Sequence, residues 1–313
     1  MRPHARVTQP LVSVVLPLHN GERFLGEALR SVLWQSLREL ELIVVDDGST
    51  DGGRALAEAE AARDARVQVL AGPGQGISAA CNLGLARATG TYIARMDQDD
   101  RCHPRRLEHQ ADFLRSHPEV GVLGGQKRLF GAAGLRQYDY PARHEDIQAA
   151  VFFYCPILGP TSMFRASLVP QNGALYASGE DYAEDYGLLS RWLEAGLKAA
   201  VLPELVLDYR VHPGQASQTQ APRLTLAADA IRLRWLNRMG LEPEGKEREL
   251  HLAAGQGRWG SGLDYLADLE RWFLKLRSAC AIADFPEPLA FDRVLAQRWH
   301  RSMAPPFPEE PRC

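Results

Sequence analysis

Short apolar runs alternate with segments of helical periodicity over the first hundred residues. Residues 12–16 form an apolar, β-branched run, whereas residues 22–35 repeat apolar side chains at the spacing of one helix face. Further apolar runs predict strands at 42–45, 67–70 and 91–96, and the segments between them predict helices at 54–62 and 78–88. This alternation predicts a mainly parallel, twisted sheet with helices on both faces, so the expected fold class is α/β.

Polar and acidic residues follow three of the predicted strands. Residues 17–20 follow the first strand, Asp46 and Asp47 end the second, and the run D-Q-D-D at 97–100 ends the fourth. Because ligands bind beyond the carboxyl ends of parallel strands, we expect these residues to converge on one site. Gathered carboxylates repel one another unless a cation lies among them. Mg²⁺ and Mn²⁺ favour carboxylate oxygens and keep positions open for phosphate, so the pattern predicts a divalent metal site.

The composition narrows the range of partners and compartments. The 313 residues are 45% hydrophobic, enough to bury the core of one large domain or of one domain with an extension. A formal net charge of -3 and the lack of a polybasic run argue against nucleic acid as a partner. The amino terminus lacks the apolar core of a signal peptide, and no apolar run reaches the roughly 20 residues of a membrane span, so we expect a cytoplasmic protein. Five scattered cysteines without a C-x-x-C pair predict neither a disulfide framework nor a zinc site.

Four motifs occur in series between residues 12 and 212. They read V-S-V-V-L-P-L-H-N-G-E, E-L-I-V-V-D-D-G-S-T-D-G, G-I-S-A-A-C-N-L-G-L-A-R-A-T-G-T-Y-I-A-R-M-D-Q-D-D and A-E-D-Y-G-L-L-S-R-W. In this order and at these intervals they resemble the family 2 glycosyltransferases, which have the GT-A fold, over about two thirds of the chain. The resemblance implies an inverting enzyme, a hexosyltransferase of the bacterial surface-polysaccharide type. Its donor would be a nucleotide diphosphate sugar, above all a UDP-sugar, and its acceptor a hydroxyl of a glycan or lipid-linked molecule.

The resemblance also implies which residues hold the nucleoside of the donor. Pro17, Asn20 and Glu22 stand where the family binds the nucleoside. Asp47, with Asp46 beside it, stands where an acidic side chain accepts a hydrogen bond from the pyrimidine ring. Taken alone, residues 46–51 would more often be a turn and a helix cap.

The D-x-D motif at 97–99 implies the position of the metal. Asp99 is the implied direct ligand of Mn²⁺ or Mg²⁺, and Asp97 the implied contact to the ribose and the metal. A later motif, Y-R-V-H, adds His212 as a ligand and Arg210 as a contact to the diphosphate. The alternative for 97–100 is a solvated acidic turn that caps the next helix. Asn82 is a further implied donor contact, or else belongs to a small-residue helix face packed on the sheet.

A pair of acidic residues matches the position of the family's general base. Glu184 and Asp185 fit this pair, and Asp185 is the predicted base, a role worth about 10²- to 10⁴-fold in rate. Glu180 and Asp181 form a second candidate pair one helical turn earlier. We choose the later pair because Arg191 lies six residues beyond Asp185, which is the arrangement of the family.

Some features differ from the family or allow other functions. Cys81 stands where many members have Arg or Leu, and Gly159 and Pro160 lie where other relatives have His. The glycine-rich loop at 72–76 lacks the spacing and position of a dinucleotide fingerprint, so we expect a flexible loop near the donor. The alternative functions are a non-catalytic sugar-nucleotide-binding protein and a sugar-phosphate nucleotidyltransferase.

The pattern of the family fades after about residue 215. We expect a catalytic domain over 1–215, with the donor part at about 11–125 and the acceptor and base part at about 126–215, followed by a mostly helical extension over 216–313. The extension has a predicted helix at 224–239 and a Pro-rich tail at 304–313. One stripe at helical spacing is expected to pack against the catalytic domain: Leu263, Leu266, Leu269, Phe273 and Leu276. Basic residues beside the stripe suggest, as a weaker hypothesis, peripheral contact with the cytoplasmic membrane: Arg271, Lys275 and Arg277.

Overall fold

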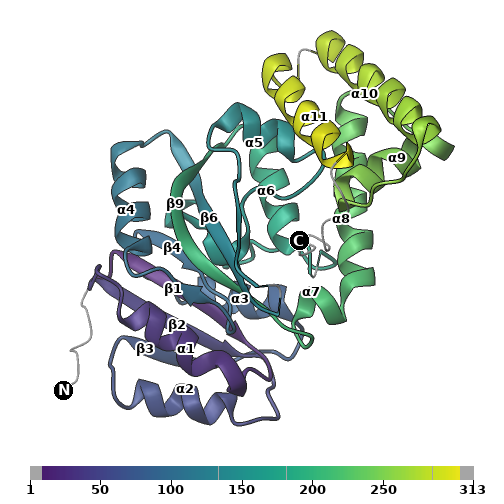
Figure 1. The fold of residues 1–313 in the computed structure, drawn as a ribbon. Helices are drawn as coiled ribbons and strands as arrows, with labels where there is room; N and C mark the ends of the chain where they lie inside the picture. The colour runs from purple at the N-terminus through teal and green to yellow at the C-terminus, as the bar shows by residue number, and fades with distance from the viewer. Residues whose placement is uncertain (1–8, 133, 181, 284, 304–313) are drawn as a thin grey trace.

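A sheet of nine strands forms the centre of the structure, with helices on both of its faces (Figure 1). The computed structural model describes residues 9–132, 134–180, 182–283 and 285–303, and all statements below concern these residues. Asp181 and the Pro-rich tail at 304–313 therefore lie outside the described residues. The arrangement confirms the predicted α/β class with a helical C-terminal part.

The first half of the sheet follows the predicted alternation of strands and helices. Its elements are β1 (Val12–Leu18), α1 (Glu22–Leu33), β2 (Leu40–Asp46), α2 (Gly53–Ala61), β3 (Val67–Ala71), α3 (Ile77–Leu85) and β4 (Tyr92–Arg95). The strands lie in the order β3-β2-β1-β4, and all three pairs are parallel. Every residue of β1 and β2 is buried, as is typical of parallel strands that are covered on both faces.

The second half of the sheet is mixed. Its elements are β5 (Arg101–Cys102), α4 (Arg106–Ser116), β6 (Val120–Gly131), β7 (Arg136–Tyr138), α5 (His144–Ala150), η1 (Gly159–Thr161), β8 (Met163–Arg165), η2 (Ala166–Leu168), α6 (Glu184–Glu194) and β9 (Lys198–Val211). The long strand β9 pairs in parallel with β6 and antiparallel with β5. The short strand β8 lies between β4 and β6 and runs antiparallel to both. The predicted parallel order thus applies to β1–β4. Beyond β4 the sheet is mixed, because β8 and β5 run antiparallel to their neighbours whereas β6 and β9 run parallel to each other.

The sheet separates two hydrophobic clusters. Successive residues of β1 point to opposite faces, so Val14 packs with α1 and α4, whereas Val15 packs with α3 and the C-terminal half. Helix α3 approaches β1 so closely that a Cβ atom at Gly84 would lie 2.5 Å from Val15 Cγ1. The absence of a side chain at Gly84 therefore allows α3 to lie flat against the sheet.

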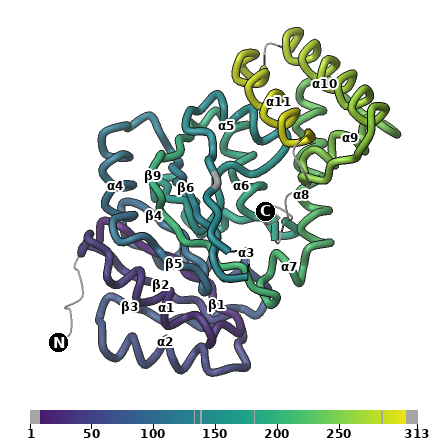
Figure 2. The backbone as a smooth tube through the Cα atoms, in the orientation of Figure 1, coloured from purple at the N-terminus to yellow at the C-terminus, as the bar shows by residue number. Residues whose placement is uncertain are grey.

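Five helices follow β9 and gather at one side of the molecule (Figure 2). They are α7 (Ala216–Thr219), α8 (Ala221–Arg238), α9 (Gly245–Gln256), α10 (Leu263–Ala283) and α11 (Pro288–Met303). Aromatic rings join them to the segment after α5: the ring centroids of Phe152 and Trp235 are 5.5 Å apart, and those of Phe153 and Phe273 are 6.2 Å apart. The two parts thus share one hydrophobic cluster.

The apolar stripe of α10 is buried except at its start. Leu269, Phe273 and Leu276 are buried in the shared cluster, Leu266 is half-buried, and Leu263, the first residue of the helix, is 85% exposed. The expectation of packing is therefore correct for the middle of the stripe and wrong for Leu263, where the helix extends beyond its neighbours. Because the buried part faces the protein interior, it is not available as a membrane-binding face.

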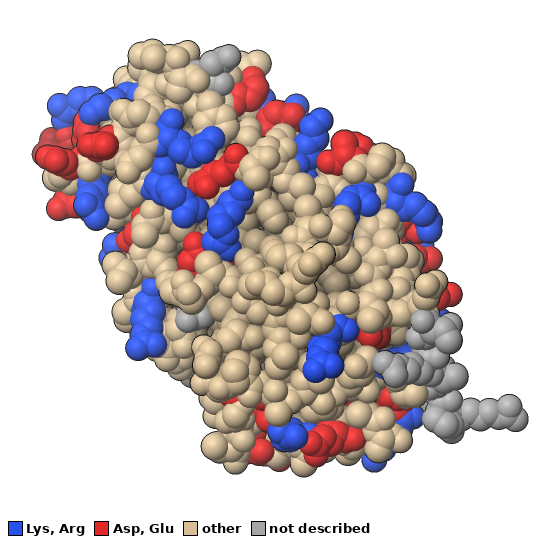
Figure 3. All heavy atoms as spheres, turned by 180° about the vertical axis from the view of Figure 1, so that it is seen from behind, with Lys and Arg blue, Asp and Glu red and all other residues tan. Residues whose placement is uncertain are grey.

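The basic residues beside that stripe form ion pairs. Arg271 pairs with Asp268, and Lys275 with Glu247, while Arg277 pairs with Asp292. On the face turned away in Figure 1, positive and negative side chains are interspersed over the C-terminal helices (Figure 3). Within the described ranges, no helix combines the length and the hydrophobicity needed to cross a membrane.

Candidate active site

Three carboxylates lie together in the loop that follows β4. Asp97, Asp99 and Asp100, the acidic cluster, each place one carboxylate oxygen within 4.8 Å of the others. Asp100 is buried; its Oδ1 accepts a hydrogen bond of 2.8 Å from the Arg210 backbone N–H, while its Oδ2 has no hydrogen-bond partner. Burial raises the pKa of Asp97 to about 6, against the opposing effect of Arg95, and raises the pKa of Asp100 well above its ordinary value. Burial thus disfavours the charged forms of both carboxyl groups, which a nearby cation would favour.

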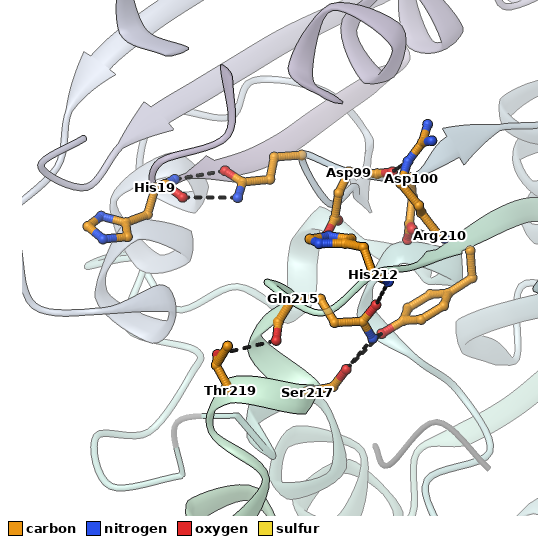
Figure 4. A network of polar contacts seen from close by, with 10 residues as sticks. His19, Asp99, Asp100, Arg210, His212, Gln215, Ser217 and Thr219 are labelled. Atoms are coloured by element: carbon orange, nitrogen blue, oxygen red, sulfur yellow. Dashed lines mark hydrogen bonds and ion pairs between the residues drawn. The ribbon is translucent and has the colours of Figure 1, made fainter. Parts of the chain in front are cut away.

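His212 extends the acidic cluster from the end of β9. Its Nε2 lies 2.9 Å from Asp99 Oδ2, and Figure 4 shows the imidazole facing that carboxylate. The backbone N–H of His212 donates to Gln215 Oε1 at 2.7 Å. The imidazole packs against the ring of Phe24, and this contact restricts the orientation of the imidazole. Carboxylate oxygens with one imidazole form a donor set that suits Mn²⁺ or Mg²⁺, and the unpartnered Asp100 Oδ2 fits a cation at this place. The structure therefore brings together the predicted ligands Asp97, Asp99 and His212.

The Arg210 side chain turns away from the imidazole (Figure 4). Its Nε donates to the Asp99 backbone carbonyl at 2.7 Å, and its Nη2 donates to Glu27 Oε2 at 2.7 Å. The guanidinium carbon lies 4.3 Å from the ring centroid of Phe24 and 4.4 Å from that of Phe130. In this arrangement Arg210 holds the loop of the acidic cluster in place, and its contact with a diphosphate stays a prediction.

Asp47 fastens the glycine-rich loop at 72–76. Its Oδ1 accepts a hydrogen bond from the Gly74 N–H and its Oδ2 one from the Gly76 N–H, both 2.7 Å long. Asp46 Oδ1 accepts a hydrogen bond from Ser49 N–H at 3.2 Å, so the side chain stabilises its own turn. The loop thus lies beside the carboxyl end of β2, where the nucleoside is expected, and the predicted hydrogen bond from a pyrimidine to Asp47 is untested.

The ends of β1 and β2 are locked together by side chains of the first motif. Asn20 has a φ of 51°, and its Oδ1 accepts a hydrogen bond of 2.8 Å from the Thr50 N–H. Glu22 Oε2 accepts one of 3.0 Å from the Gly52 N–H. Pro17 lies within β1, opposite Val45 of β2. These residues form the wall on which the nucleoside is predicted to lie.

Asn82 is fully engaged with another part of the chain. Its Oδ1 accepts hydrogen bonds of 3.0 and 2.8 Å from the N–H groups of Leu175 and Tyr176, and its Nδ2 donates to the Tyr176 carbonyl at 2.8 Å. These bonds tie α3 to the loop before α6. The observed role of Asn82 is therefore to connect α3 with this loop, and its contact with the donor stays a prediction.

Glu184 and Asp185, the acidic pair that contains the predicted general base, begin helix α6. Asp185 Oδ2 accepts a hydrogen bond of 2.6 Å from the Gly159 N–H, and its Oδ1 has no hydrogen-bond partner. Glu184 is buried beside it, and burial together with the charge of Asp185 raises the pKa of Glu184 to about 8. Glu180, from the alternative pair, forms an ion pair with Arg191. Asp181 lies outside the described residues.

The donor side and the base side open onto one cavity of about 100 Å³. Asp97 lines it from the acidic cluster, and Glu184 and Asp185 line it from α6. Tyr182, which has a φ of 74°, and Tyr209 of β9 add aromatic walls. An arrangement of this kind can hold a reacting group between a cation-binding loop and a carboxylate base.

The sequence analysis missed Arg95, the last residue of β4. The structure places its guanidinium in the same cavity, beside the carboxylates of Asp97, Glu184 and Asp185. One signal in the sequence could have indicated it: an arginine inside the apolar run T-Y-I-A-R-M, directly before an acidic motif. An arginine is seldom buried unless it is paired, so its partners had to be acidic side chains from elsewhere.

Comparison with known proteins identifies the family of this chain. The model of the family described as "Glycosyl transferase family 2" matches residues 13–166. The amylovoran biosynthesis glycosyltransferase AmsE of Erwinia amylovora is 31% identical over 204 residues, which are 64% of this chain and 76% of AmsE. The chain belongs to glycosyltransferase family 2.

Solved structures show the fold of this family 2 glycosyltransferase. The crystal structure of S. aureus TarS 1-349 in complex with UDP matches with a TM-score of 0.57 at 20% identity, covering 93% of this chain and 92% of that one. The mannosyltransferase PcManGT from Pyrobaculum calidifontis, in complex with GDP-Man and Mn²⁺, matches with a TM-score of 0.56 at 18% identity, covering 96% and 87%. At these identities the likeness shows the fold, which is GT-A. The substrates of this glycosyltransferase have to be inferred from its own residues.

Proposed function

We propose that this family 2 glycosyltransferase transfers a hexose from a UDP-sugar to an acceptor hydroxyl with inversion, assisted by Mn²⁺ or Mg²⁺. One observation carries the proposal: Asp97 of the acidic cluster and Asp185 of α6 line the same cavity. A sugar held between them would have its leaving diphosphate on one side and its attacking hydroxyl on the other. Displacement from opposite sides is the geometry of an inverting reaction.

The donor is proposed to lie across the carboxyl ends of the parallel strands. Pro17, Asn20 and Glu22 would hold the nucleoside, and Asp47 would accept a hydrogen bond from the uracil ring. The complex of S. aureus TarS with UDP supports a uridine donor. PcManGT was solved with GDP-Man, so the nucleobase has to be tested rather than assumed from the fold.

The acidic cluster and His212 are proposed to hold the divalent cation. Asp99, Asp97 and His212 supply the donor atoms, and the Mn²⁺ in the PcManGT complex supports this use of the fold. When bound, the cation neutralises the negative charge that the departing diphosphate gains. Arg210 contributes by fixing the backbone of Asp99.

Asp185 is proposed to act as the general base. It would accept the proton of the acceptor hydroxyl as the hydroxyl oxygen bonds to the anomeric carbon and the bond to the diphosphate breaks. Its Oδ2 is occupied by the Gly159 N–H, whereas Oδ1 has no hydrogen-bond partner and is the oxygen proposed to take the proton. Glu184, whose pKa burial raises to about 8, is proposed to stay protonated beside Asp185 near neutral pH.

The acceptor is proposed to be a glycan or a lipid-linked glycan of a surface polysaccharide made on the cytoplasmic side. The role that its name gives AmsE in amylovoran biosynthesis supports this class of product.

We also propose the division into a catalytic domain, 1–215, and an extension, 216–313. Peripheral membrane contact stays a prediction that the ion-paired residues of α10 do not support, and flotation with anionic vesicles tests it.

Calorimetric titration with UDP, dTDP and GDP, each with and without Mn²⁺, tests the donor assignment. We expect UDP to bind only with the metal, and we expect Asp99→Ala to lose this binding. Glu58→Ala, on the exposed face of α2, is the matched carboxylate control and should bind UDP as the wild type does. Tighter binding of GDP than of UDP would reject the uridine donor, and no binding of any diphosphate would reject the transferase.

A further inference from the structure

Arg95 lies between the two halves of the reaction site. Its side chain is 3% exposed. Nη2 lies 3.0 Å from Asp97 Oδ1 and 3.7 Å from Glu184 Oε1, and Nη1 lies 3.5 Å from Asp185 Oδ1. One buried cation is thus shared by carboxylates from two segments that are more than eighty residues apart in the sequence.

Gly159 provides the space in which Arg95 and Asp185 meet. A Cβ atom at this position would lie 2.1 Å from Arg95 Nη1 and 2.6 Å from each Asp185 carboxylate oxygen. The Gly159 N–H meanwhile donates to Asp185 Oδ2. The Asp185 carboxylate is therefore hydrogen-bonded at Oδ2 by the backbone N–H, whereas its Oδ1 lies at ion-pair distance from the guanidinium without a hydrogen bond.

The shape of the guanidinium matters for this arrangement. Its nitrogen atoms form a rigid, planar fork that reaches carboxylates on different sides at once, whereas the ammonium of a lysine is a single point charge on a flexible stem. Without a cation here, the carboxylates of Asp97 and Asp185 would repel each other. The position of Asp185 would then depend on the Gly159 N–H alone.

We propose that Arg95 is a positioning residue that fixes the carboxylate of Asp185 relative to Asp97 and thereby aligns the base with the donor. This inference rests on the proposed function, because it assigns Asp185 as the base. The proposal also assigns a role to Gly159, because a larger residue at this position would separate Arg95 from Asp185. A displacement of the base by about 1 Å is sufficient to reduce the rate about 100-fold.

The test compares Arg95→Met, Arg95→Lys and Gly159→Ala with the wild type. UDP release is measured with UDP-glucose, UDP-galactose and UDP-N-acetylglucosamine, with water as the acceptor, and UDP affinity is measured by calorimetry with Mn²⁺. We expect kcat of Arg95→Met to fall about 100-fold, whereas the UDP affinity, which Arg95 influences only through its ion pair with Asp97, should fall much less. Arg95→Lys should recover part of the loss, and Gly159→Ala should lower kcat with the arginine still present.

The double variant Arg95→Met with Asp185→Asn separates positioning from a general structural role. Residues that act as one unit have non-additive effects, so the double variant should be no slower than Asp185→Asn alone. Multiplied losses, or unchanged kcat in Arg95→Met and Gly159→Ala, would overturn the inference. If Arg95→Met does not fold, Arg95→Lys and Gly159→Ala decide the matter.

Arg298 of α11 provides the matched control. It is as buried as Arg95, but it stacks on Tyr154, with its guanidinium carbon 4.3 Å from the ring centroid. Arg298→Met should lower the unfolding temperature and leave kcat unchanged; an equal fall of kcat in both variants would overturn the inference. A wild type that neither binds UDP nor releases it from any donor would reject the proposed function itself, whereas an active wild type with equally active Arg95 variants would reject only the role of Arg95.

Discussion

His212 Nε2 lies 2.9 Å from Asp99 Oδ2, although 113 positions separate the two residues in the sequence. The contact joins the loop after β4 to the end of β9. A cation at the acidic cluster would therefore bind groups from both halves of the sheet, and its affinity would report how well the two halves fit together.

We expect His212→Ala to weaken Mn²⁺ binding by at least about 10- to 100-fold, which is the usual cost of removing a group that only supports a metal ligand. The measurement is a Mn²⁺ titration followed by electron paramagnetic resonance in the presence of UDP. The control is His117→Ala, in which the removed ring stacks on Phe113 at the C-terminal end of α4. This variant should bind Mn²⁺ as the wild type does. Equal affinity in both variants would show that His212 takes no part in the metal site.

Asp185→Asn is expected to lower turnover by about 10²- to 10⁴-fold, because the amide cannot accept the proton of the attacking hydroxyl. UDP affinity should stay unchanged, since Asp185 contacts the Gly159 N–H and Arg95 rather than the nucleoside wall. The measurement is UDP release from a UDP-sugar. The matched control is Asp181→Asn, which should keep its activity. Loss of turnover only in the Asp181 variant would move the base to the earlier pair.

The buried His251 predicts a pH dependence of stability. Its Nε2 donates to the Phe152 carbonyl at 2.9 Å, and burial lowers its pKa to about 3, against an ordinary value of 6.5. Between these pH values the unfolded chain binds a proton that the folded chain does not. The contribution of His251 to the free energy of unfolding is therefore fully present above pH 6.5. This contribution is lost as the pH falls toward 3, by up to about 1.4 kcal/mol per pH unit.

Urea unfolding at a series of pH values from 4 to 8 measures this effect. We expect the difference in unfolding free energy between wild type and His251→Gln to shrink as the pH falls below 6.5, because the glutamine side chain does not titrate. A difference that is the same at every pH would contradict the assignment of a neutral, buried His251.

Gly84→Ala is expected to destabilise the fold by about 1–3 kcal/mol, because the added methyl group would strike Val15 across the contact between α3 and β1. Gly26→Ala is the matched control in helix α1, where the nearest atom to an added Cβ is 3.7 Å away. This control should be neutral or stabilising by up to about 1 kcal/mol, given the helix preference of alanine. Thermal unfolding of both variants checks the pair, and equal stabilities would contradict the close approach.

Local patterns were sufficient to predict the elements of the parallel half. The β1 and β2 segments are mainly apolar because both faces of these strands are covered, and α1 shows one clear apolar face. Acidic residues at the strand ends could be placed on one rim because parallel strands share the direction of their carboxyl ends. The clustering of Asp97 with Asp99 and Asp100 follows from this rule.

Contacts between distant segments could not be predicted in the same way. Nothing near Asn82 shows that the backbone of Leu175 and Tyr176 occupies its amide. The acidic motif after Arg95 contains its partner Asp97, but nothing near Arg95 indicates that Glu184 and Asp185 also face it. The pairing of β6 with β9 also depends on packing across some eighty residues rather than on a local pattern. The roles of side chains whose partners lie far away in the sequence could therefore be determined only from the structure.

The position of His212 at the end of β9 has a consequence for the order in which the protein matures. During synthesis the nucleoside wall and the acidic cluster leave the ribosome more than a hundred residues before His212 does. The contact with Asp99 must wait for β9 to pair with β6 and β5, and closing so long a loop is slow compared with forming a local turn. A growing chain thus lacks the complete proposed cation site, and we expect it to act on an activated sugar only once the sheet is closed.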